Sequence, residues 1–200
     1  MKTKLILASG SPRRREILQD IGIDFQILSV ETDEYCENPE PTAFAEEIAL
    51  KKGQAAWAKV KLNLKQGIDQ TDGVILTADT VVAVGNRILG KPKDREDALR
   101  MIRMLSGNTH AVITGIGLTI GGVTTTDHCV TKVNVLQIPE EEIVKYVDSG
   151  DPMDKAGGYG IQGSFSRWIR GIHGCYFNVV GLPVSTLNHL FYCCTGEYLS

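Results

Sequence analysis

A short apolar run that passes directly into a loop of small residues is the feature that most constrains this fold. Leu5-Ile6-Leu7 has the length and composition of a buried strand, and Gly10 and Pro12 follow it closely. An amphipathic stretch then runs to about residue 21. Gly10 lets the backbone approach a ligand, Ser11 suits the position before a helix, and Pro12 suits its first turn. We therefore predict strand, tight loop and helix at the start of the chain.

The same loop has the character of an anion site. It ends at a predicted helix N-terminus, where free N–H groups and the helix dipole favour negative charge. Arg13 and Arg14 add forked donors that match phosphate oxygens. The alternative is an ordinary strand-to-helix loop with solvated arginines.

Alternation of strand-like and helix-like patterns predicts an α/β fold around a mixed sheet. In the first half of the chain the two patterns alternate, which favours parallel strand pairing. Gly121-Gly122 separates two strand-like runs and suits a tight hairpin, so antiparallel pairing enters there. Asp94 suits the N-cap of a following helix, and Gly107 suits its end. The strand-like runs lie near 3–8, 24–31, 73–83, 110–120, 123–137 and 174–181, and the helical patterns near 12–21, 41–61, 93–106, 139–149 and 184–195.

Length and composition indicate a globular protein in a reducing compartment. The chain has 200 residues, of which 42% are hydrophobic, so we expect one domain over residues 1–200 or two closely joined lobes. The formal net charge of -3 argues against a protein that coats nucleic acid. The first apolar run is too short for a signal peptide, and no stretch has the length of a membrane span. The five cysteines lack CxxC spacing, which indicates a cytoplasmic setting without a disulfide framework or zinc site.

Two nucleotide-binding patterns in the chain lack essential parts. Residues 85–91 match most of a P-loop, but Pro92 stands where Ser or Thr should hold magnesium and supplies no N–H to a phosphate. Residues 158–163 fit the GxGxxG pattern of dinucleotide-binding folds, but no clear strand precedes them. The sequence also has no acidic residue between Asp154 and Glu197 that could bind a ribose hydroxyl. The four histidines lack ligand spacing and no GxSxG elbow is present, so Ser-His-Asp hydrolase chemistry is not supported.

Several carboxylates occupy positions that suggest chemistry. Asp79 lies inside the apolar run 74–82, where an unpaired carboxylate would be costly, so it should be paired, bound to metal or exposed at a cleft. Asp33 and Glu34 follow the strand-like residues 25–28, and Glu31 and Glu37 lie close to them in the sequence. They form either a solvated acidic loop or, beside phosphate-binding groups, a magnesium site, since that ion prefers oxygen ligands.

Lysines supply further candidates. Lys52 falls near the centre of the apolar stripe of the predicted helix 41–61, whereas Lys51 falls at its edge. An inward lysine either extends to water or reaches a partner such as a phosphate. Lys91 and Lys155 each stand beside small residues that open the backbone nearby.

Motifs spread over nearly the whole chain resemble those of one family. They occur in family order from about residue 5 to 190, and the ordered set is far more specific than any single block. The motifs are residues 7–14 (LASGSPRR), 78–82 (ADTVV), 90–92 (GKP), 104–107 (MLSG), 154–163 (DKAGGYGIQG) and 179–183 (VVGLP). The chain thereby resembles the Maf family of nucleoside triphosphate pyrophosphatases.

The resemblance implies a fold, an activity and a cofactor. The fold would be an elongated mixed β-sheet with flanking helices and two lobes around a central cleft, similar to that of ITPase-like proteins. The activity would be cleavage of a nucleoside triphosphate to monophosphate and pyrophosphate in the cytoplasm, with a divalent cation, Mg or Mn. A homodimer is a further expectation from the family.

The resemblance also assigns roles to individual residues. The catalytic aspartate of the family falls on Asp79, and its acidic metal ligand falls most naturally on Glu34, with Glu31 and Asp33 as neighbouring alternatives. Gly53, Gly158 and Phe177 depart from the residues usual in the family. The phosphate-binding positions fall on Ser9, Ser11, Arg13, Arg14, Lys52 and Lys91.

Subfamily resemblance predicts that dTTP and UTP, and possibly modified pyrimidine nucleotides, are the preferred substrates, as in a nucleotide-pool sanitising enzyme. Arg13, Thr80 and Gln162 fall on the positions associated with selectivity. The Gln162 amide carries a donor and an acceptor that can pair with uracil or thymine, although an amide flip would also accommodate cytosine. Two alternatives stay open: a 7-methyl-GTP-specific pyrophosphatase, and a non-catalytic nucleotide-binding regulator of cell division or septum formation.

Overall fold

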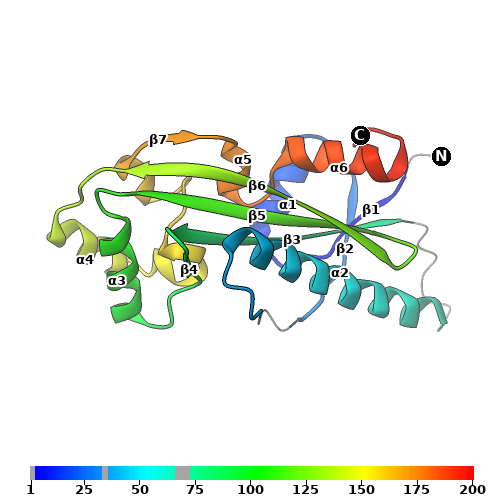
Figure 1. Cartoon of the computed structure of the whole chain (residues 1–200), viewed down its shortest axis with the longest axis horizontal. Helices are drawn as coiled ribbons and strands as arrows, with labels where there is room; N and C mark the ends of the chain where they lie inside the picture. Colours follow the sequence, from blue (N-terminus) through cyan, green and yellow to red (C-terminus); the bar gives the residue numbers. More distant parts are fainter. Residues whose placement is uncertain (1–2, 33–35, 66–72) are drawn as a thin grey trace.

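Two long strands joined by a tight turn form the middle of the sheet. In the computed structural model, which describes residues 3–32, 36–65 and 73–200, β5 (Thr109–Ile120) and β6 (Val123–Val135) pair along their full length. Gly121 and Gly122 make the turn with φ of 58° and 93°, as the sequence predicts. Figure 1 shows this hairpin running along most of the molecule.

The described residues form a mixed seven-stranded sheet, which confirms the predicted fold class. The strand order is β2-β1-β3-β5-β6-β7, and β4 pairs with β3 outside this path. As predicted for the first half, β1 pairs in parallel with both β2 and β3, whereas the other pairs are antiparallel. The remaining strands are β1 Leu5–Leu7, β2 Phe25–Ile27, β3 Val74–Val84, β4 Arg87–Leu89 and β7 Ile169–His173.

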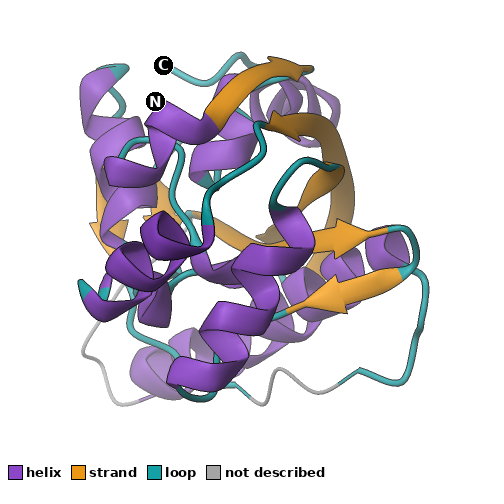
Figure 2. Cartoon of the chain, turned by 90° about the vertical axis from the view of Figure 1, so that its left-hand side faces the viewer, coloured by secondary structure: helices purple, strands orange, loops and turns teal. Residues whose placement is uncertain are grey.

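Helices cover both faces of the sheet because side chains alternate along its strands. Leu7 and Leu76 pack under the helices of one face, and Ile6 and Ile75 pack against the helix of the other. Figure 2, viewed from the end that carries α3 and α4, shows helices flanking the strands. The helices are α1 Pro12–Asp20, α2 Pro41–Lys65, α3 Arg95–Leu105, α4 Glu140–Asp148, α5 Tyr176–Val180 and α6 Val184–Thr195.

Helix α2 lies unusually close to β5. A Cβ added to Gly115 would come within 2.4 Å of the backbone C and O atoms of Ala45, and one added to Gly117 would meet the carbonyl of Ala49 at 3.2 Å. The glycines on β5 therefore set the depth at which α2 packs. Because α2 carries Lys52, this close approach also places that lysine against the sheet.

The hydrophobic core has one large cluster toward each end of the central strands. One contains residues of β1, α1 and α6, and the other contains residues of α3 and α4 packed on Val82, Val112 and Val133. Among residues 3–32, 36–65 and 73–200, no helix combines the length and apolar character needed to cross a bilayer. The predicted division into two lobes stays a prediction.

One predicted strand is wrong. Residues 174–181 contain the short helix α5, and the strand β7 lies just before them. A short apolar run does not by itself distinguish strand from helix. Here the polar Asn178 faces the sheet and donates to the carbonyl of Val112, which a helical turn permits.

Smaller local expectations have mixed outcomes. Asp94 caps α3 by accepting a hydrogen bond from the backbone N of Asp97, and Gly107 follows the helix with φ of 71°, as expected. Pro12 begins α1, but the Ser11 side chain makes no capping hydrogen bond. Residues 85–91 contain the turn after β3 and the strand β4 that pairs back onto it, consistent with the rejection of a P-loop.

Candidate functional site

An interruption in the strand pairing of β3 creates the candidate site. On the edge of β3 opposite β5, β1 pairs with residues 74–76 and β4 pairs with residues 82–84. Between them, no described strand lies beside residues 77–81. Successive side chains of a strand point to opposite faces of the sheet. Because the gap lies at the edge of β3 and opens to both faces, the successive residues Asp79 and Thr80 line the same cavity.

The cavity has a volume of about 830 Å³, within the range of small-molecule sites. It brings together segments from the first loop to α5, and Glu31 and Thr32 also contribute to its wall. Glu34 lies outside the described residues. The predicted site residues that line the cavity are Ser9, Ser11, Arg13, Arg14, Lys52, Asp79, Thr80, Lys91 and Gln162.

Asp79 forms an ion pair with Lys52 across the gap between β3 and α2. Lys52 Nζ lies 2.7 Å from Asp79 Oδ1, and the two side chains are only 15% and 14% exposed. Lys51, its neighbour on the helix, pairs instead with Glu47, and both of those side chains are more than a third exposed. The inward position predicted for Lys52 is therefore correct, and Asp79 is paired in the way a carboxylate in an apolar strand requires.

Arg14 ties three segments of the site together. Its Nε donates to the carbonyl of Gly181 at 2.8 Å, its Nη1 to Ser9 Oγ at 3.0 Å, and its Nη2 to Thr80 Oγ1 at 3.1 Å. The flat guanidinium with its fixed fork of donors suits this arrangement, which a lysine could not reproduce. Arg14 thus fixes the first loop against β3 and the end of α5.

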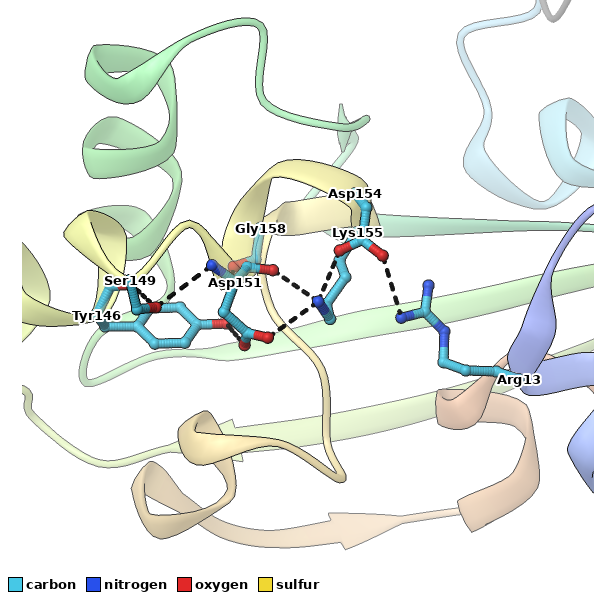
Figure 3. Close-up of polar contacts among 7 residues, drawn as sticks. All are labelled: Arg13, Tyr146, Ser149, Asp151, Asp154, Lys155 and Gly158. Carbon is cyan, nitrogen blue, oxygen red and sulfur yellow. Dashed lines mark hydrogen bonds and ion pairs between the residues drawn. The ribbon is translucent and has the colours of Figure 1, made fainter.

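Arg13 points across the cavity toward the segment that follows α4. Its Nη1 lies 3.9 Å from Asp154 Oδ2, and the Asp154 side chain is 69% exposed, so the attraction between them is weak. Figure 3 shows Arg13 reaching from the first loop toward Asp154. Arg13 can therefore exchange this partner for a ligand anion at little cost.

Lys155, a candidate phosphate-binding residue from the sequence, is held by its own segment. Its Nζ donates to the Asp151 carbonyl at 2.6 Å, to Asp151 Oδ1 at 3.1 Å and to Asp154 Oδ1 at 2.6 Å. Tyr146 adds a hydrogen bond to Asp151 Oδ2 (Figure 3). Two carboxylates thus hold the Lys155 ammonium group against this wall of the cavity.

The glycine-rich part of that wall rests on a buried aromatic pair. Tyr159 lines the cavity, and its hydroxyl lies 2.6 Å from His110 Nε2. Burial lowers the pKa of His110 to about 4 and raises the pKa of Tyr159 above its ordinary value. The histidine is therefore neutral at pH 7, and its Nε2 either accepts the tyrosine proton or donates to the tyrosine oxygen, according to the tautomer.

Sequence reasoning missed a row of polar groups behind Thr80. Thr114 on β5 and Asn178 on α5 are fully buried, and the Thr114 hydroxyl donates to the carbonyl of Asn178. Thr114 also pairs with the Thr80 hydroxyl, and the Asn178 side chain donates to the sheet. Asn178 stands out in the sequence as a polar residue within an apolar run, which was the available signal. Thr114 gave none, because its place opposite Thr80 depends on strand register.

Comparison with known proteins gives consistent matches over nearly the whole chain. The profile of a family described as Maf-like protein matches residues 4–193. A protein of Agathobacter rectalis named dTTP/UTP pyrophosphatase is 46% identical over 193 residues, covering 92% of this chain and 94% of its own. Proteins with the same name from Alkaliphilus metalliredigens and Acetivibrio thermocellus are 44% and 45% identical, each covering 94% of this chain and 95% and 93% of their own, respectively.

Proposed function

The chain belongs to the Maf family, and on that premise we propose that it hydrolyses dTTP and UTP to the nucleoside monophosphate and pyrophosphate. The names of the similar proteins support this activity. The observation that carries the proposal is the Lys52–Asp79 pair, which stands in one cavity with the Arg13-Arg14 loop. A carboxylate beside a set of cations is the arrangement that hydrolysis of a phosphoric anhydride requires.

Asp79 is the proposed catalytic residue. In this proposal a water molecule attacks the α-phosphorus, pyrophosphate leaves, and Asp79 orients the water or accepts its proton. The ion pair with Lys52 fixes the position of this carboxylate at the wall of the cavity. General base catalysis by a positioned carboxylate contributes about 10²–10⁴-fold in rate.

The proposed triphosphate site combines the first loop with two lysines. Developing charge on the leaving pyrophosphate needs compensation by fixed donors and cations. The N-terminus of α1 contributes its free N–H groups at the edge of this loop. The residues proposed to bind phosphate are Ser9, Ser11, Arg13, Arg14, Lys52 and Lys91, all of which line the cavity.

A divalent cation, Mg or Mn, is part of the proposal. The Asp79 carboxylate fits such an ion, because magnesium binds through one or two carboxylates together with substrate phosphates. The described residues contain no preassembled group of three or more acidic, histidine or cysteine ligands. We therefore propose Asp79 and Glu34, or the neighbouring Glu31 or Asp33, as its protein ligands. When bound, the ion would neutralise charge on the triphosphate.

Base selection is assigned to Arg13, Thr80 and Gln162 in this proposal, all of which line the cavity. A site built to hydrogen bond one base discriminates strongly, since the wrong base leaves buried polar groups unpaired.

The proposal also retains the further expectations from the sequence: one domain over residues 1–200 with two lobes, a cytoplasmic location and a homodimer. The five cysteines, which are free thiols, are compatible with that location.

The test is pyrophosphate release from dTTP, UTP, CTP, GTP and 7-methyl-GTP with Mg or Mn. We expect the highest kcat/KM with dTTP and UTP. In ¹⁸O-labelled water the label should appear in the monophosphate, because water attacks the α-phosphorus. A preference for 7-methyl-GTP would assign the chain to that branch instead. Nucleotide binding without turnover would favour the regulator.

A further inference from the structure

A line of hydrogen bonds runs from the cavity into the protein behind Thr80. Arg14 Nη2 donates to Thr80 Oγ1 at 3.1 Å, and Thr80 Oγ1 lies 2.9 Å from Thr114 Oγ1. Thr114 Oγ1 in turn donates to the backbone carbonyl of Asn178 at 3.1 Å. Thr80 and Thr114 face each other in register on β3 and β5.

The position of each hydroxyl proton follows from counting donors. A threonine hydroxyl has one proton and two lone pairs. A carbonyl oxygen only accepts, so the single proton of Thr114 is directed to Asn178. Thr114 therefore accepts in its contact with Thr80, and the proton of Thr80 is directed to Thr114. Of the two Thr80 lone pairs, one accepts from Arg14, and the other remains for the cavity that Thr80 lines.

The far end of this line is firmly anchored. Asn178 is fully buried, and its Nδ2 donates to the Val112 carbonyl and to Thr131 Oγ1, both at 2.9 Å. Thr131 Oγ1 also donates to the carbonyl of Cys175 at the start of α5. The carbonyl that orients Thr114 is thus fixed between β5 and β6, and the Thr80 proton cannot turn toward the cavity without breaking a buried hydrogen bond.

We propose that Thr114 and Asn178 are positioning residues that make the Thr80 hydroxyl a fixed acceptor for the imide N3–H of uracil or thymine. This inference rests on the proposed function. Cytosine has an unprotonated N3 at the same place, so two acceptors would face each other. Gln162 cannot enforce that distinction, because its amide can flip to suit either base. The Thr80 hydroxyl can enforce it, because its only proton is already donated to Thr114 on the buried side.

The test compares equilibrium binding of UMP and CMP by calorimetry, which needs no turnover. In Thr114→Val the Thr80 hydroxyl loses its acceptor and becomes free to donate into the cavity. We expect the preference for UMP over CMP to narrow about tenfold, the equivalent of one hydrogen bond. Thr114→Ser restores both hydrogen bonds and should keep the wild-type preference.

Thr119→Val is the matched control. Thr119 is also a fully buried threonine of β5, but its hydroxyl pairs with Thr124 and it is not among the cavity-lining residues. The Thr119→Val variant should show the same preference for UMP over CMP as the wild type. An unchanged preference in folded Thr114→Val, or an equal loss in Thr119→Val, overturns the proposal, as does a wild type that binds both nucleotides equally.

A second pair of variants covers the case in which Thr114→Val does not fold. Thr80→Val removes the acceptor itself and should abolish the preference, whereas Thr80→Ser should retain it; equal preferences in the two contradict the inference. The outcome for the proposed function is separate. If the wild type prefers UMP but releases no pyrophosphate from any triphosphate, the pyrophosphatase proposal fails while the role of Thr114 in base selection stands.

Discussion

Lys52 Nζ and Asp79 Oδ1 are 2.7 Å apart and join α2 to β3 at the point where the edge of β3 is unpaired. The ion pair is largely shielded from solvent, so each partner depends on the other more than an exposed pair would. A ligand that enters the cavity therefore meets a positioned carboxylate together with its cationic partner.

Asp79→Asn should abolish most turnover and preserve the fold. The amide keeps the shape of the side chain but cannot accept a proton from water, so kcat should fall about 10²–10⁴-fold. Pyrophosphate release from dTTP measures the effect, and circular dichroism checks the fold. Near-normal turnover would remove Asp79 from the catalytic role.

Lys52→Ala should damage catalysis far more than Lys51→Ala. The first substitution leaves the Asp79 carboxylate without its ion-pair partner at a site only 14% exposed, whereas the second removes an exposed pair with Glu47. The comparison uses kcat/KM for UTP in both variants. Equal losses would contradict the distinct roles given to these adjacent lysines.

Removal of divalent cations should abolish activity. The charge on the triphosphate and on the departing pyrophosphate needs compensation beyond that of the protein cations. Turnover in excess chelator should fall to background and return on addition of Mg or Mn but not of Na. Full activity in the chelator would exclude the metal from the proposal.

Stability should decline with acid between about pH 6.5 and pH 4 because of His110. Its pKa is about 4 in the folded protein against an ordinary value of 6.5, so the unfolded chain takes up the proton first. The stabilisation is complete above pH 6.5 and is lost as pH falls toward 4, on the order of 3 kcal/mol in total. Protonation is costly because it places a charge in a buried site, where the imidazolium has a proton on both ring nitrogens and Nδ1 has no partner among the described residues.

Urea unfolding at several pH values tests this dependence. His110→Asn should flatten the slope between pH 6.5 and pH 4, whereas His173→Asn, at an exposed position of β7, should leave it in place. An equally steep slope without His110 would show that other groups produce it.

Gly115→Ala should destabilise the protein without direct contact with a ligand. The added methyl group would overlap backbone atoms of α2 at 2.4 Å, and a backbone cannot move aside as a flexible side chain does. We expect a loss of about 1–3 kcal/mol or more in the free energy of unfolding. Gly171→Ala on β7 is the control, since nothing lies within 4 Å of its added Cβ. Similar losses in both variants would contradict the proposed packing.

Local sequence signals predicted most of the fold. The apolar run 5–7, the Gly121-Gly122 turn and the Asp94 cap each act over a few residues, so they can be recognised without knowledge of the rest of the chain. The errors occurred where local patterns are ambiguous. Residues 176–180 form a helix although they are apolar and short enough for a strand, and the three-residue strand β4 is too brief to show a period.

The residues that line the cavity could be predicted from the sequence, but the hydrogen bonds between them and the rest of the chain could not. Family motifs located Arg14, Asp79 and Thr80, all of which line it. The partners of these residues come from distant parts of the chain. Thr114 meets Thr80 through the register of β3 on β5, and the Gly181 carbonyl meets Arg14 only after α5 packs on the sheet. Periodicity carries no information about such pairings.

The hydrogen bond from Arg14 to Gly181 spans 167 positions of the chain, which has a consequence for synthesis on the ribosome. A growing chain presents the arginine loop, Lys52 and Asp79 long before Gly181 emerges. Until then Arg14 lacks its anchor on α5, and the row from Thr80 through Thr114 has no carbonyl at its end. The polypeptide can therefore begin to fold early from its N-terminal part, yet the hydrogen bonds that Arg14 and Thr114 make in the finished site form only after residues 178–181 have been synthesised.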